Sequence, residues 1–393
     1  MNDARDPRLL PQALYVHLPF CTAICTYCDF AVERYAAARA VRYLDALERE
    51  LHTRTAVLGL SERFAPRTIF LGGGTPTAFN IPELQRFFEI LERDVDTSRT
   101  VEFTIEANPG TVDDAKLRFL LEHRVTRLSL GVQSFQPHLL QLLGRVHGAD
   151  QGPEAIAAAR AAGFKNISLD LMHGLPKQTP EHLRDDLQRA IALGTDHISA
   201  YSIMYEDGTP LANAVTRGLV TPLTPEVEAA HFQTVMETFE NAGWTQYEVS
   251  NFARPGFESE HNLIYWRNEA YLGVGVGSAS SIGGERNVNH DSVDDYIRDA
   301  MSSGLAIASR ERLDPVARAG EALMLEWRLR RGVNLAEFAA RWGVDLFDGA
   351  DNSRTVALAR YLREGLMERL PDGRIRISRR GLPVSDGILA DFV

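Results

Sequence analysis

The sequence predicts an α/β protein: a partial barrel of six strand–helix units, followed by a small helical, winged-helix-like domain. Six short apolar or β-branched runs recur in the first 205 residues, at 14–18, 68–72, 101–107, 127–132, 166–172 and 197–203. Segments between them carry apolar residues at helical spacing, as at Leu84, Phe87, Phe88 and Leu91. Strands alternating with helices indicate a parallel sheet, and six units are fewer than the eight of a closed barrel.

The segment 206–305 predicts an extension of the barrel. A turn-rich stretch precedes a helix with Thr224 as N-cap, Pro225 at its first position and Gly243 just past its end. Residues 244–253 then predict one strand, and the glycine- and serine-rich residues 272–284 predict a loop near a site.

The last part, 306–393, predicts a separate C-terminal domain. Its pattern is helical at first and ends in a hairpin around Asp372-Gly373. Helices followed by a small β-ribbon are typical of a winged helix. The basic stretches at 328–332 and 377–381 are short, so we expect a lid or a docking surface for another protein rather than a nucleic-acid site.

Charge and hydropathy limit the possible partners of the protein and the compartment in which it works. The chain has 393 residues, with 53 Asp and Glu against 42 Lys and Arg, and its net charge of −11 argues against nucleic acid as a partner. Neither a secretory signal nor an apolar run of membrane-spanning length is evident. We therefore expect a cytoplasmic protein without an integral membrane segment. The sequence leaves open a peripheral membrane contact and a dimer.

Residues with chemical potential follow one strand after another. In a parallel barrel, the reactive residues lie at the C-terminal ends of the strands. The cysteines of 21–28 follow the first predicted strand, and the second runs into the glycines of 72–74. The third strand ends at Glu106, the fourth at Gln133 and the sixth near Tyr201, and the fifth carries Asp170. Their common position predicts a single site at one end of the barrel.

All the cysteines of the chain, Cys21, Cys25 and Cys28, lie within eight residues after the first strand. Thiolates bind zinc and iron–sulfur clusters. A structural zinc would need a fourth ligand, for which His17 and Asp29 are candidates. A cubane cluster on three cysteines would instead leave one iron open to a small molecule. Three cysteines close together do not form an even set of disulfides.

The spacing Cys-x3-Cys-x2-Cys after a first barrel strand, with Tyr27 before the last cysteine, resembles the signature of the radical S-adenosylmethionine (radical SAM) superfamily. The resemblance implies a [4Fe–4S] cluster on Cys21, Cys25 and Cys28. It also implies that S-adenosylmethionine chelates the open iron and is cleaved by one electron to a 5′-deoxyadenosyl radical. The cofactors carry such chemistry, and the protein positions them.

Further motifs narrow the resemblance. YVHLPFCTAICTYCDF, GGGTPT, EANPGT, GVQSF, LGRVH, LDLMHGLPKQT and HNLIYW occur in this order between residue 15 and about residue 285. Together they resemble the oxygen-independent coproporphyrinogen III oxidase-like (HemN-like) family. The implied S-adenosylmethionine ligands are Tyr15, Gly73 and Glu106. The implied second nucleoside-binding set is Gly74, Thr75, Gln133, Arg145 and Asp170, although Arg145 is equally typical of a helix surface.

Two branches of this family differ after the third cysteine. The decarboxylating oxidase has a further cysteine where this sequence has Phe30, and a longer segment than the 20 residues that precede Cys21 here. The CDF ending and HNLIYW resemble instead the haem chaperone branch, called HemW. That branch is implied to bind haem and transfer it to acceptor haemoproteins. The alternative is porphyrin metabolism by catalysis, as a coproporphyrinogen III oxidase or in another radical reaction on a tetrapyrrole.

The HNLIYW segment is the candidate haem contact. His261 is a candidate axial ligand, and Tyr265 and Trp266 offer flat apolar surface to a porphyrin. The alternative is a packed aromatic turn around a hydrogen-bonded histidine. Other histidines that compete as iron ligands are His17, His147 and His173.

Overall fold

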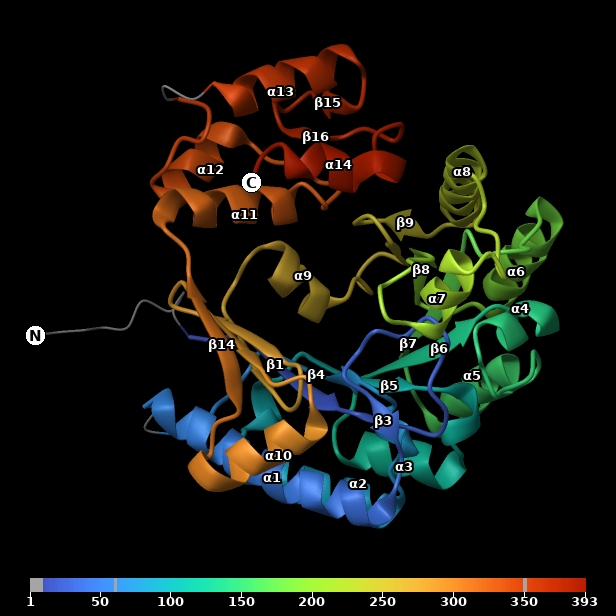
Figure 1. Cartoon of the computed structure of the whole chain (residues 1–393), viewed down its shortest axis with the longest axis vertical. Coiled ribbons are helices and arrows are strands. Elements are labelled where there is room, and N and C mark those ends of the chain that lie inside the picture. The colour runs from blue at the N-terminus through green and yellow to red at the C-terminus, as the bar shows by residue number, and fades with distance from the viewer. Residues whose placement is uncertain (1–9, 60–61, 349–351) are drawn as a thin grey trace, which may run out of the picture.

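The computed structural model describes residues 10–59, 62–348 and 352–393 (Figure 1). It confirms the predicted α/β class. A mixed sheet of twelve strands runs through the main domain in the order β14-β13-β12-β11-β1-β4-β5-β6-β7-β8-β10-β9. The C-terminal helices form a second body above one end of the sheet in Figure 1.

Six parallel strands form the centre of this sheet and confirm the predicted strand–helix units. They are β1 (Ala13–Leu18), β4 (Thr68–Gly73), β5 (Glu102–Ala107), β6 (Arg127–Gln133), β7 (Asn166–His173) and β8 (His197–Ser202). Each agrees with its predicted range to within one residue at either end. The strands are largely buried, as expected of a parallel sheet covered by helices.

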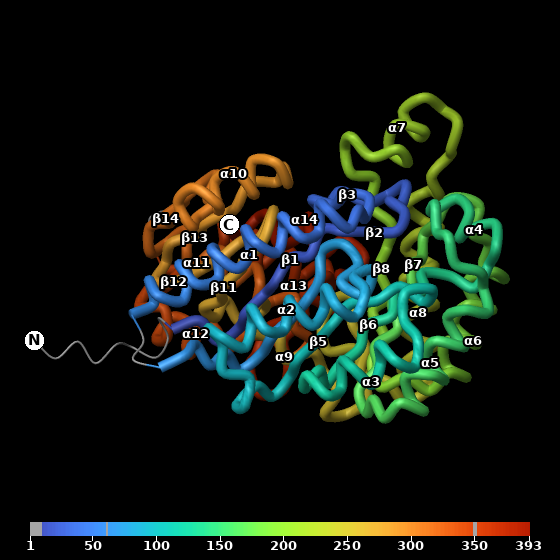
Figure 2. Tube along the Cα trace, turned by 90° about the horizontal axis from the view of Figure 1, so that it is seen from below, coloured from blue at the N-terminus to red at the C-terminus, as the bar shows by residue number. Residues whose placement is uncertain are grey.

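Helices cover the outer side of the parallel strands, and Figure 2 shows α1, α2 and α3 crossing that side. The helices of this part are α1 (Ala37–Val57), α2 (Ile81–Asp94), α3 (Asp114–Glu122), α4 (Pro137–Leu142), α5 (Gln151–Ala162), α6 (Pro180–Leu193) and α7 (Pro210–Thr216). Asn80 caps α2 in a reciprocal capping box with Glu83. The predicted stripe of Leu84, Phe87, Phe88 and Leu91 is buried against the sheet.

Short elements shape the strand ends where the site lies. A two-stranded parallel pair, β2 (Phe20–Cys21) and β3 (Glu33–Arg34), closes the cysteine loop. Single turns of 3₁₀-helix occur at η2 (Pro76–Ala78), η3 (Thr97–Arg99), η4 (Pro109–Thr111) and η5 (Leu382–Val384). Two of these, η2 and η4, follow directly on strands β4 and β5, so they turn the chain away from the end of the barrel.

The predicted extension adds strands at both edges of the sheet. Its elements are α8 (Pro225–Asn241), β9 (Thr245–Gln246), β10 (Asn251–Ala253), α9 (Glu260–Trp266), β11 (Tyr271–Val274), β12 (Ala279–Ile282), β13 (Glu285–Asn289) and α10 (Val293–Ser303). Strand β14 (Ile307–Arg312) lies past the predicted boundary at residue 305 but belongs to the same sheet. Strand β11 pairs in parallel with β1, whereas β12, β13 and β14 follow as antiparallel neighbours. Thr224 and Gly243 flank α8 as predicted, and Gly243 has φ 92°.

The loop predicted at 272–284 is wrong, because most of this segment forms β11 and β12. Its glycines serve close packing of the backbone rather than flexibility. A Cβ on Gly273 would lie 2.0 Å from the carbonyl oxygen of Ala279 on the neighbouring strand. Glycine is therefore required for the two strands to approach each other here.

The single strand predicted at 244–253 is also corrected. The structure divides it into β9 and β10, which pair with each other in antiparallel fashion. Strand β10 also pairs antiparallel with β8 and so extends the barrel's edge. Gln246 stabilises the turn between them, since its Nε2 donates to the carbonyl oxygen of Val249 over 3.0 Å.

The C-terminal domain has helices followed by a hairpin in the predicted order, but it does not end there, because a further helix follows the hairpin. It comprises α11 (Pro315–Glu326), α12 (Leu335–Trp342), α13 (Ser353–Arg363), β15 (Met367–Arg369), β16 (Ile375–Ile377) and α14 (Ser385–Ala390). The buried indole of Trp327 joins helices and hairpin by donating to the carbonyl oxygen of Ile375 over 3.0 Å. Among the residues described, no helix is both long and apolar enough to cross a membrane.

Candidate functional site

The cysteine loop lies at the C-terminal end of β1. Cys21 is buried, Cys25 and Cys28 are half-buried, and all three are free thiols. Burial raises the pKa of the Cys28 thiol to about 11 and also raises that of Cys21. Both groups are therefore neutral at physiological pH unless a cationic group binds and holds them as thiolates.

Side-chain hydrogen-bond donors point at two of the three sulfurs. Arg145 Nη1 donates to Cys25 Sγ over 3.2 Å, and Thr75 Oγ1 donates to Cys21 Sγ over 3.5 Å. The loop itself is tied to the chain after α4, because Thr26 donates its backbone N–H to Leu143 and its hydroxyl to Leu142. Donors of this kind stabilise sulfur ligands of a metal cluster.

The zinc alternative finds no support in this geometry. His17 Nδ1 lies 3.2 Å from Tyr15 Oη, and its Nε2 lies 2.9 Å from the carbonyl oxygen of Ala31, so neither nitrogen is free. Asp29 is exposed. Three thiols with donors to their sulfurs fit a cluster held by three cysteines instead.

The glycine turn after β4 lies beside the cysteine loop. Gly73 has φ +97°, and a Cβ there would lie 2.4 Å from the ring of His17. Its backbone N–H donates to Glu106 Oε2 over 3.2 Å. The turn therefore needs glycine, because the ring of His17 fills the space that a side chain would take.

Two carboxyl groups lie in the interior of the barrel. Burial, together with the charge of Asp170, raises the pKa of Glu106 to about 8. Burial also raises the pKa of Asp170, which accepts a hydrogen bond from Ser129 Oγ over 3.1 Å, while Arg127 opposes the shift. Glu106 is thus mostly protonated at neutral pH, and a bound ligand with a positive charge or hydroxyl groups would change its state.

Arg145 is linked to the predicted site residue Thr75 through Asn108. Its Nη2 donates to Asn108 Oδ1 and to the carbonyl oxygen of Gly131, and Asn108 Nδ2 donates to Thr75 Oγ1 over 2.8 Å. Arg145 therefore bonds to residues of the cysteine loop and the strand ends, and its side chain does not lie free on a helix surface. A small cavity of about 40 Å³ lies against Cys25, Asn108 and Arg145.

Gln133 and Tyr27 complete the predicted set at the barrel end. Gln133 has φ +70°, unusual for a residue with a side chain, at a bulge where β6 pairs with β7. Tyr27 packs on a small apolar cluster that includes Leu139 and Met172. Burial raises the pKa of Tyr27 above its ordinary value, and the neighbouring Cys25 contributes.

Sequence reasoning missed two residues that organise this region. Asn108 follows β5 directly and precedes Pro109-Gly110, a turn signal that marks a strand end but gives no hint of its bonds. Glu102, at the start of β5, is buried and accepts from Ser259 Oγ and from the backbone N–H of Glu260 and His261. It anchors the first turn of α9, and nothing in the local sequence indicates that contact.

His261 is fully engaged in hydrogen bonds. Its Nδ1 lies 2.8 Å from Thr68 Oγ1 and its Nε2 lies 2.9 Å from Tyr265 Oη. Burial, with a contribution from Arg127, lowers the pKa of His261 to about 3. The segment thus forms the packed aromatic turn considered as the alternative, with no free imidazole nitrogen in this arrangement.

The other residues of HNLIYW face different neighbours. Tyr265 packs edge-on against Tyr271 with ring centroids 4.7 Å apart, and Trp266 lies under the guanidinium of Arg328 from the C-terminal domain at 5.6 Å. Helix α9 thus lies between the sheet and α11, as Figure 1 shows. The motif connects the two domains.

The three competing histidines are also buried, and burial lowers their pKa values. The pKa is about 4 for His17 and His147 and about 3 for His173. His147 Nε2 lies 3.1 Å from the carbonyl oxygen of Val132. Both ring nitrogens of His173 are buried without a partner in the described part of the chain, and the nearby His231 contributes to its lowered pKa.

Comparison with known proteins places this site in a family. Residues 15–190 match the radical SAM superfamily, and residues 313–384 match the HemN C-terminal domain. The Heme chaperone HemW of Bacillus subtilis is 39% identical over 336 residues, which cover 85% of this chain and 88% of the relative. The chain belongs to the HemW family of radical SAM proteins.

A second HemW relative extends the similarity to nearly the whole chain. The Mycobacterium tuberculosis (strain H37Rv) protein named Heme chaperone HemW is 33% identical over 386 residues, covering 96% of this chain and 94% of its own. The structure of coproporphyrinogen III oxidase (HemN) from Escherichia coli superposes with a TM-score of 0.85 and covers 99% of this chain and 91% of that one. At 24% identity, that likeness confirms the shared fold.

Membership of the radical SAM superfamily implies a [4Fe–4S] cluster and S-adenosylmethionine as cofactors. The free thiols and their hydrogen-bond donors fit such a cluster. The exposure of Phe30, the residue that follows Asp29 in the CDF segment, is also relevant. Phe30 is 62% exposed, so its apolar ring faces solvent next to the cysteine loop.

Proposed function

We propose that this protein is a haem chaperone, which binds haem and transfers it to acceptor haemoproteins. The observation that carries the proposal is its similarity, over most of its length, to proteins named haem chaperones. Phe30 and HNLIYW support it, because both distinguish the chaperone branch from the decarboxylating oxidase. The acceptor, a dimer, a peripheral membrane contact and a cytoplasmic location stay predictions.

The proposed chaperone retains a complete radical SAM site. Cys21, Cys25 and Cys28 would hold the cluster, and Tyr15, Gly73 and Glu106 would contact S-adenosylmethionine. Bound in this way, the pair supplies one-electron cleavage of a sulfur–carbon bond. This chain's own part is to position the ligand, through the close approach at Gly73 and the carboxyl group of Glu106.

The second proposed set surrounds the first. Gly74, Thr75, Gln133, Arg145 and Asp170 would bind a second nucleoside or the far side of the first ligand. Asn108 supports this set, because it holds Arg145 and Thr75 in one hydrogen-bonded chain. The strained backbone at Gln133 fits a position selected for contact with a ligand.

The second candidate function is a radical reaction on a tetrapyrrole, with coproporphyrinogen III oxidase as its first example. The observation that favours it is the buried pair of carboxyl groups, Glu106 and Asp170, in the barrel interior, which a simple carrier has no evident need for. Phe30 argues against the oxidase itself, since its exposed ring gives no ligand and no acid.

The test uses full-length protein with its cluster reconstituted under anaerobic conditions. We expect haem to bind in an absorption titration and to move to apomyoglobin added as a haem sink. We expect coproporphyrinogen III to stay unchanged with S-adenosylmethionine and a reductant. Formation of protoporphyrinogen IX would replace the chaperone by the oxidase, and a protein that binds no haem would overturn the proposal.

A further inference from the structure

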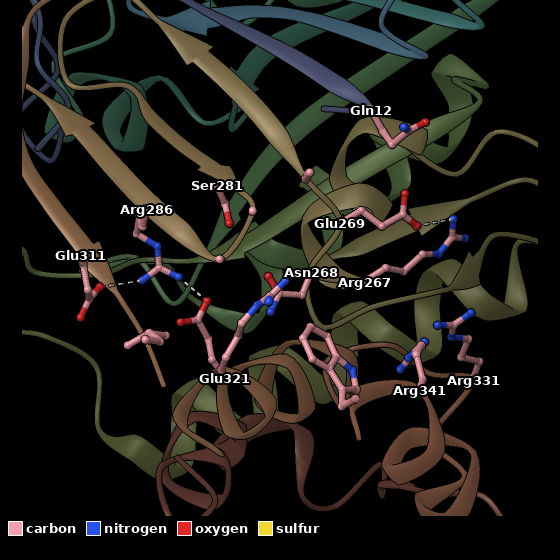
Figure 3. Close-up of a pocket in the computed structure, with 16 residues that line it drawn as sticks. Gln12, Arg267, Asn268, Glu269, Ser281, Arg286, Glu311, Glu321, Arg331 and Arg341 are labelled. Atoms are coloured by element: carbon pink, nitrogen blue, oxygen red, sulfur yellow. Dashed lines mark hydrogen bonds and ion pairs between the residues drawn. The ribbon is translucent and has the colours of Figure 1, made fainter. Parts of the chain in front are cut away.

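A large pocket lies away from the cysteine loop, between the sheet extension and the C-terminal domain. Its volume is about 840 Å³, within the range of about 300–1,000 Å³ typical of small-molecule sites. The residues just after α9, the turn between β12 and β13, the end of β14 and helices α11 and α12 line it (Figure 3). None of the residues assigned above to the cluster or the nucleosides is part of it.

The pocket concentrates positive charge on an acidic protein. Five arginines line it, and they are Arg267, Arg286, Arg318, Arg331 and Arg341. Only three glutamates line it with them, whereas acidic residues outnumber basic ones in the whole chain and give a net charge of −11. A cavity with this balance attracts anions.

The arginines differ in how well the protein itself neutralises them. Arg286 bonds to Glu321 and lies 3.4 Å from Glu311, as Figure 3 shows. By contrast, Arg318 has no carboxylate partner among the described residues and lies over the ring of Trp342 at 5.3 Å. Arg318 thus offers an unpaired guanidinium on a flat aromatic base.

Arg267 and Arg331 are only loosely paired. Arg267 Nη1 is 3.9 Å from Glu269, and its Nε is buried without a partner in the described chain. Arg331 is 3.8 Å from Glu326, a buried carboxylate that also binds Arg341. These distances are longer than hydrogen bonds, so donors of both arginines are available to a ligand.

The guanidinium groups also crowd one another. Burial lowers the pKa of Arg331 from its ordinary value; Glu326 opposes this, while the charges of Arg267, Arg374 and Arg341 lower it further. Trp342 Nε1 adds a buried donor that has no acceptor in the described part of the chain. A bound anion would relieve both the repulsion and the missing hydrogen bond.

We propose that this pocket binds the propionate edge of haem, an inference that rests on the chaperone function proposed above. Arginine binds carboxylates in a planar, bidentate geometry, and haem presents two carboxylates on one edge of a flat ring. Arg318 stacked on Trp342 offers a flat cationic surface to the same ring. The crowded, incompletely paired arginines are thus matched to a dianion.

The described residues that line the pocket offer no ligand for haem iron. Among the described residues that line the pocket, none is His, Cys, Met or Tyr, the side chains that ligate haem iron. Haem held by its propionates would therefore keep its iron open on the protein side of the pocket. An acceptor that supplies an axial ligand could then withdraw haem without competing against a ligand from the chaperone.

This placement gives HNLIYW a positioning role. Helix α9 ends at Trp266, Arg267 is its C-cap, and Asn268 follows with φ +50° and a backbone bond to Tyr265. The hydrogen bond of His261 to Thr68 on β4 fixes that helix on the sheet, whereas its bond to Tyr265 lies within the helix. His261 would thus hold Arg267 at the pocket without touching the iron.

The test compares three ligands on the full-length, cluster-loaded protein. Haem and metal-free protoporphyrin IX carry both carboxylates, whereas haem dimethyl ester carries neither. We expect the first two to bind with similar affinity and the ester to bind roughly tenfold or more weakly, because charge-assisted hydrogen bonds are lost. Each affinity is measured by fluorescence quenching and absorption.

Variants then locate the site. Arg318→Gln and Arg331→Gln should each lower the affinity for haem roughly tenfold and leave the affinity for the ester unchanged. Arg318→Lys should lower the affinity for haem by less. Arg118→Gln, on the exposed surface of α3, is the matched control and should bind haem like wild type. Thermal melts show whether each variant folds.

The outcomes separate the two proposals. Wild type that binds haem and its ester equally, with both arginine variants unaffected, would overturn the propionate pocket and leave the chaperone function standing. Wild type that binds no haem would overturn the chaperone function. Binding of protoporphyrin IX that depends on Arg318 and Arg331 would still support a dicarboxylate site in the pocket.

Discussion

Arg145 Nη1 donates a hydrogen bond to Cys25 Sγ over 3.2 Å, and the same guanidinium also bonds to the side chain of Asn108. One side chain thereby couples the cysteine loop to the end of β5. Because hydrogen bonds to cysteine sulfurs adjust the potential of an iron–sulfur cluster, this contact gives the site a measurable property.

Replacing Arg145 should make the cluster harder to reduce. Arg145→Gln removes a positive charge and a donor to Cys25, so the reduction potential should fall by roughly 60 mV for each 1.4 kcal/mol of lost stabilisation. Redox titration followed by electron paramagnetic resonance measures the shift. Arg118→Gln should leave the potential unchanged, and an equal potential in both variants would contradict a role for the Arg145 contact.

The three cysteines should be required for iron, and Phe30 should not. Alanine at Cys21, Cys25 or Cys28 should reduce iron from about four atoms per chain to near zero after reconstitution. Phe30→Cys is the informative control, because residue 30 is exposed. Its iron content and its inactivity on coproporphyrinogen III should match wild type. One zinc and no iron in the wild-type protein would instead restore the zinc alternative.

Glu106 should make the cluster-free protein less stable at alkaline pH. Its pKa in the folded protein is about 8, above its ordinary value of 4.5, so the proton is bound more tightly when folded. The contribution of protonated Glu106 to the free energy of unfolding is complete below pH 4.5 and is lost as the pH rises through 8. The loss amounts to up to a few kcal/mol.

Glu106→Gln removes that dependence. The variant should melt at a higher temperature than wild type at pH 8.5 and at a similar temperature at pH 4.5, although it should bind S-adenosylmethionine more weakly. Scanning calorimetry at both pH values tests this, with the exposed Glu122→Gln on α3 as control. A difference of equal size at both pH values would mean that ionisation of Glu106 is not the cause.

The strands could be predicted from sequence because each is a short buried run of apolar and β-branched residues. The prediction of a loop at 272–284 failed because Gly273 provides close contact between two strands, which local composition does not distinguish from flexibility. The arginine pocket could not be predicted, since Arg267, Arg318 and Arg341 come from separate elements. Likewise, no local pattern indicates that Glu102 holds α9.

Buried histidines should make the protein sensitive to acid. The pKa values of His17 and His147 are lowered to about 4, and those of His173 and His261 to about 3. Such groups stabilise the fold fully above their ordinary pKa of 6.5, and this stability is lost as the pH falls below it. For each such histidine, the free energy of unfolding falls by about 1.4 kcal/mol per pH unit until the pH reaches the pKa of that histidine in the folded protein.

His173 isolates this effect, since both its nitrogens are buried without a partner in the described chain. His173→Leu removes the titration and the unsatisfied polar atoms together. It should be at least as stable as wild type at pH 7 and lose less stability between pH 6.5 and 5 in urea titrations. The exposed His52→Gln should retain the wild-type dependence, and the same acid loss in His173→Leu would count against burial of a neutral imidazole.

Replacing His261 should weaken haem binding without changing the ligands of the iron. His261→Ala leaves the hydroxyl groups of Thr68 and Tyr265 without their hydrogen-bond partners. Each unsatisfied buried group should lower the free energy of unfolding by about 1–3 kcal/mol. The melting temperature and the haem affinity should therefore both fall, because α9 no longer holds Arg267 in place. Absorption and electron paramagnetic resonance spectra of the haem that still binds should match those of wild type.

Tyr265→Phe provides the graded comparison, since it removes only the hydrogen bond to His261 Nε2 and keeps the aromatic packing on Tyr271. Its losses of stability and affinity should lie between those of wild type and His261→Ala. Added imidazole separates positioning from ligation: it would restore the spectrum of a variant that had lost an axial histidine. We expect no restoration in His261→Ala, because the imidazole of His261 bonds to Thr68 and Tyr265 and has no nitrogen free for iron.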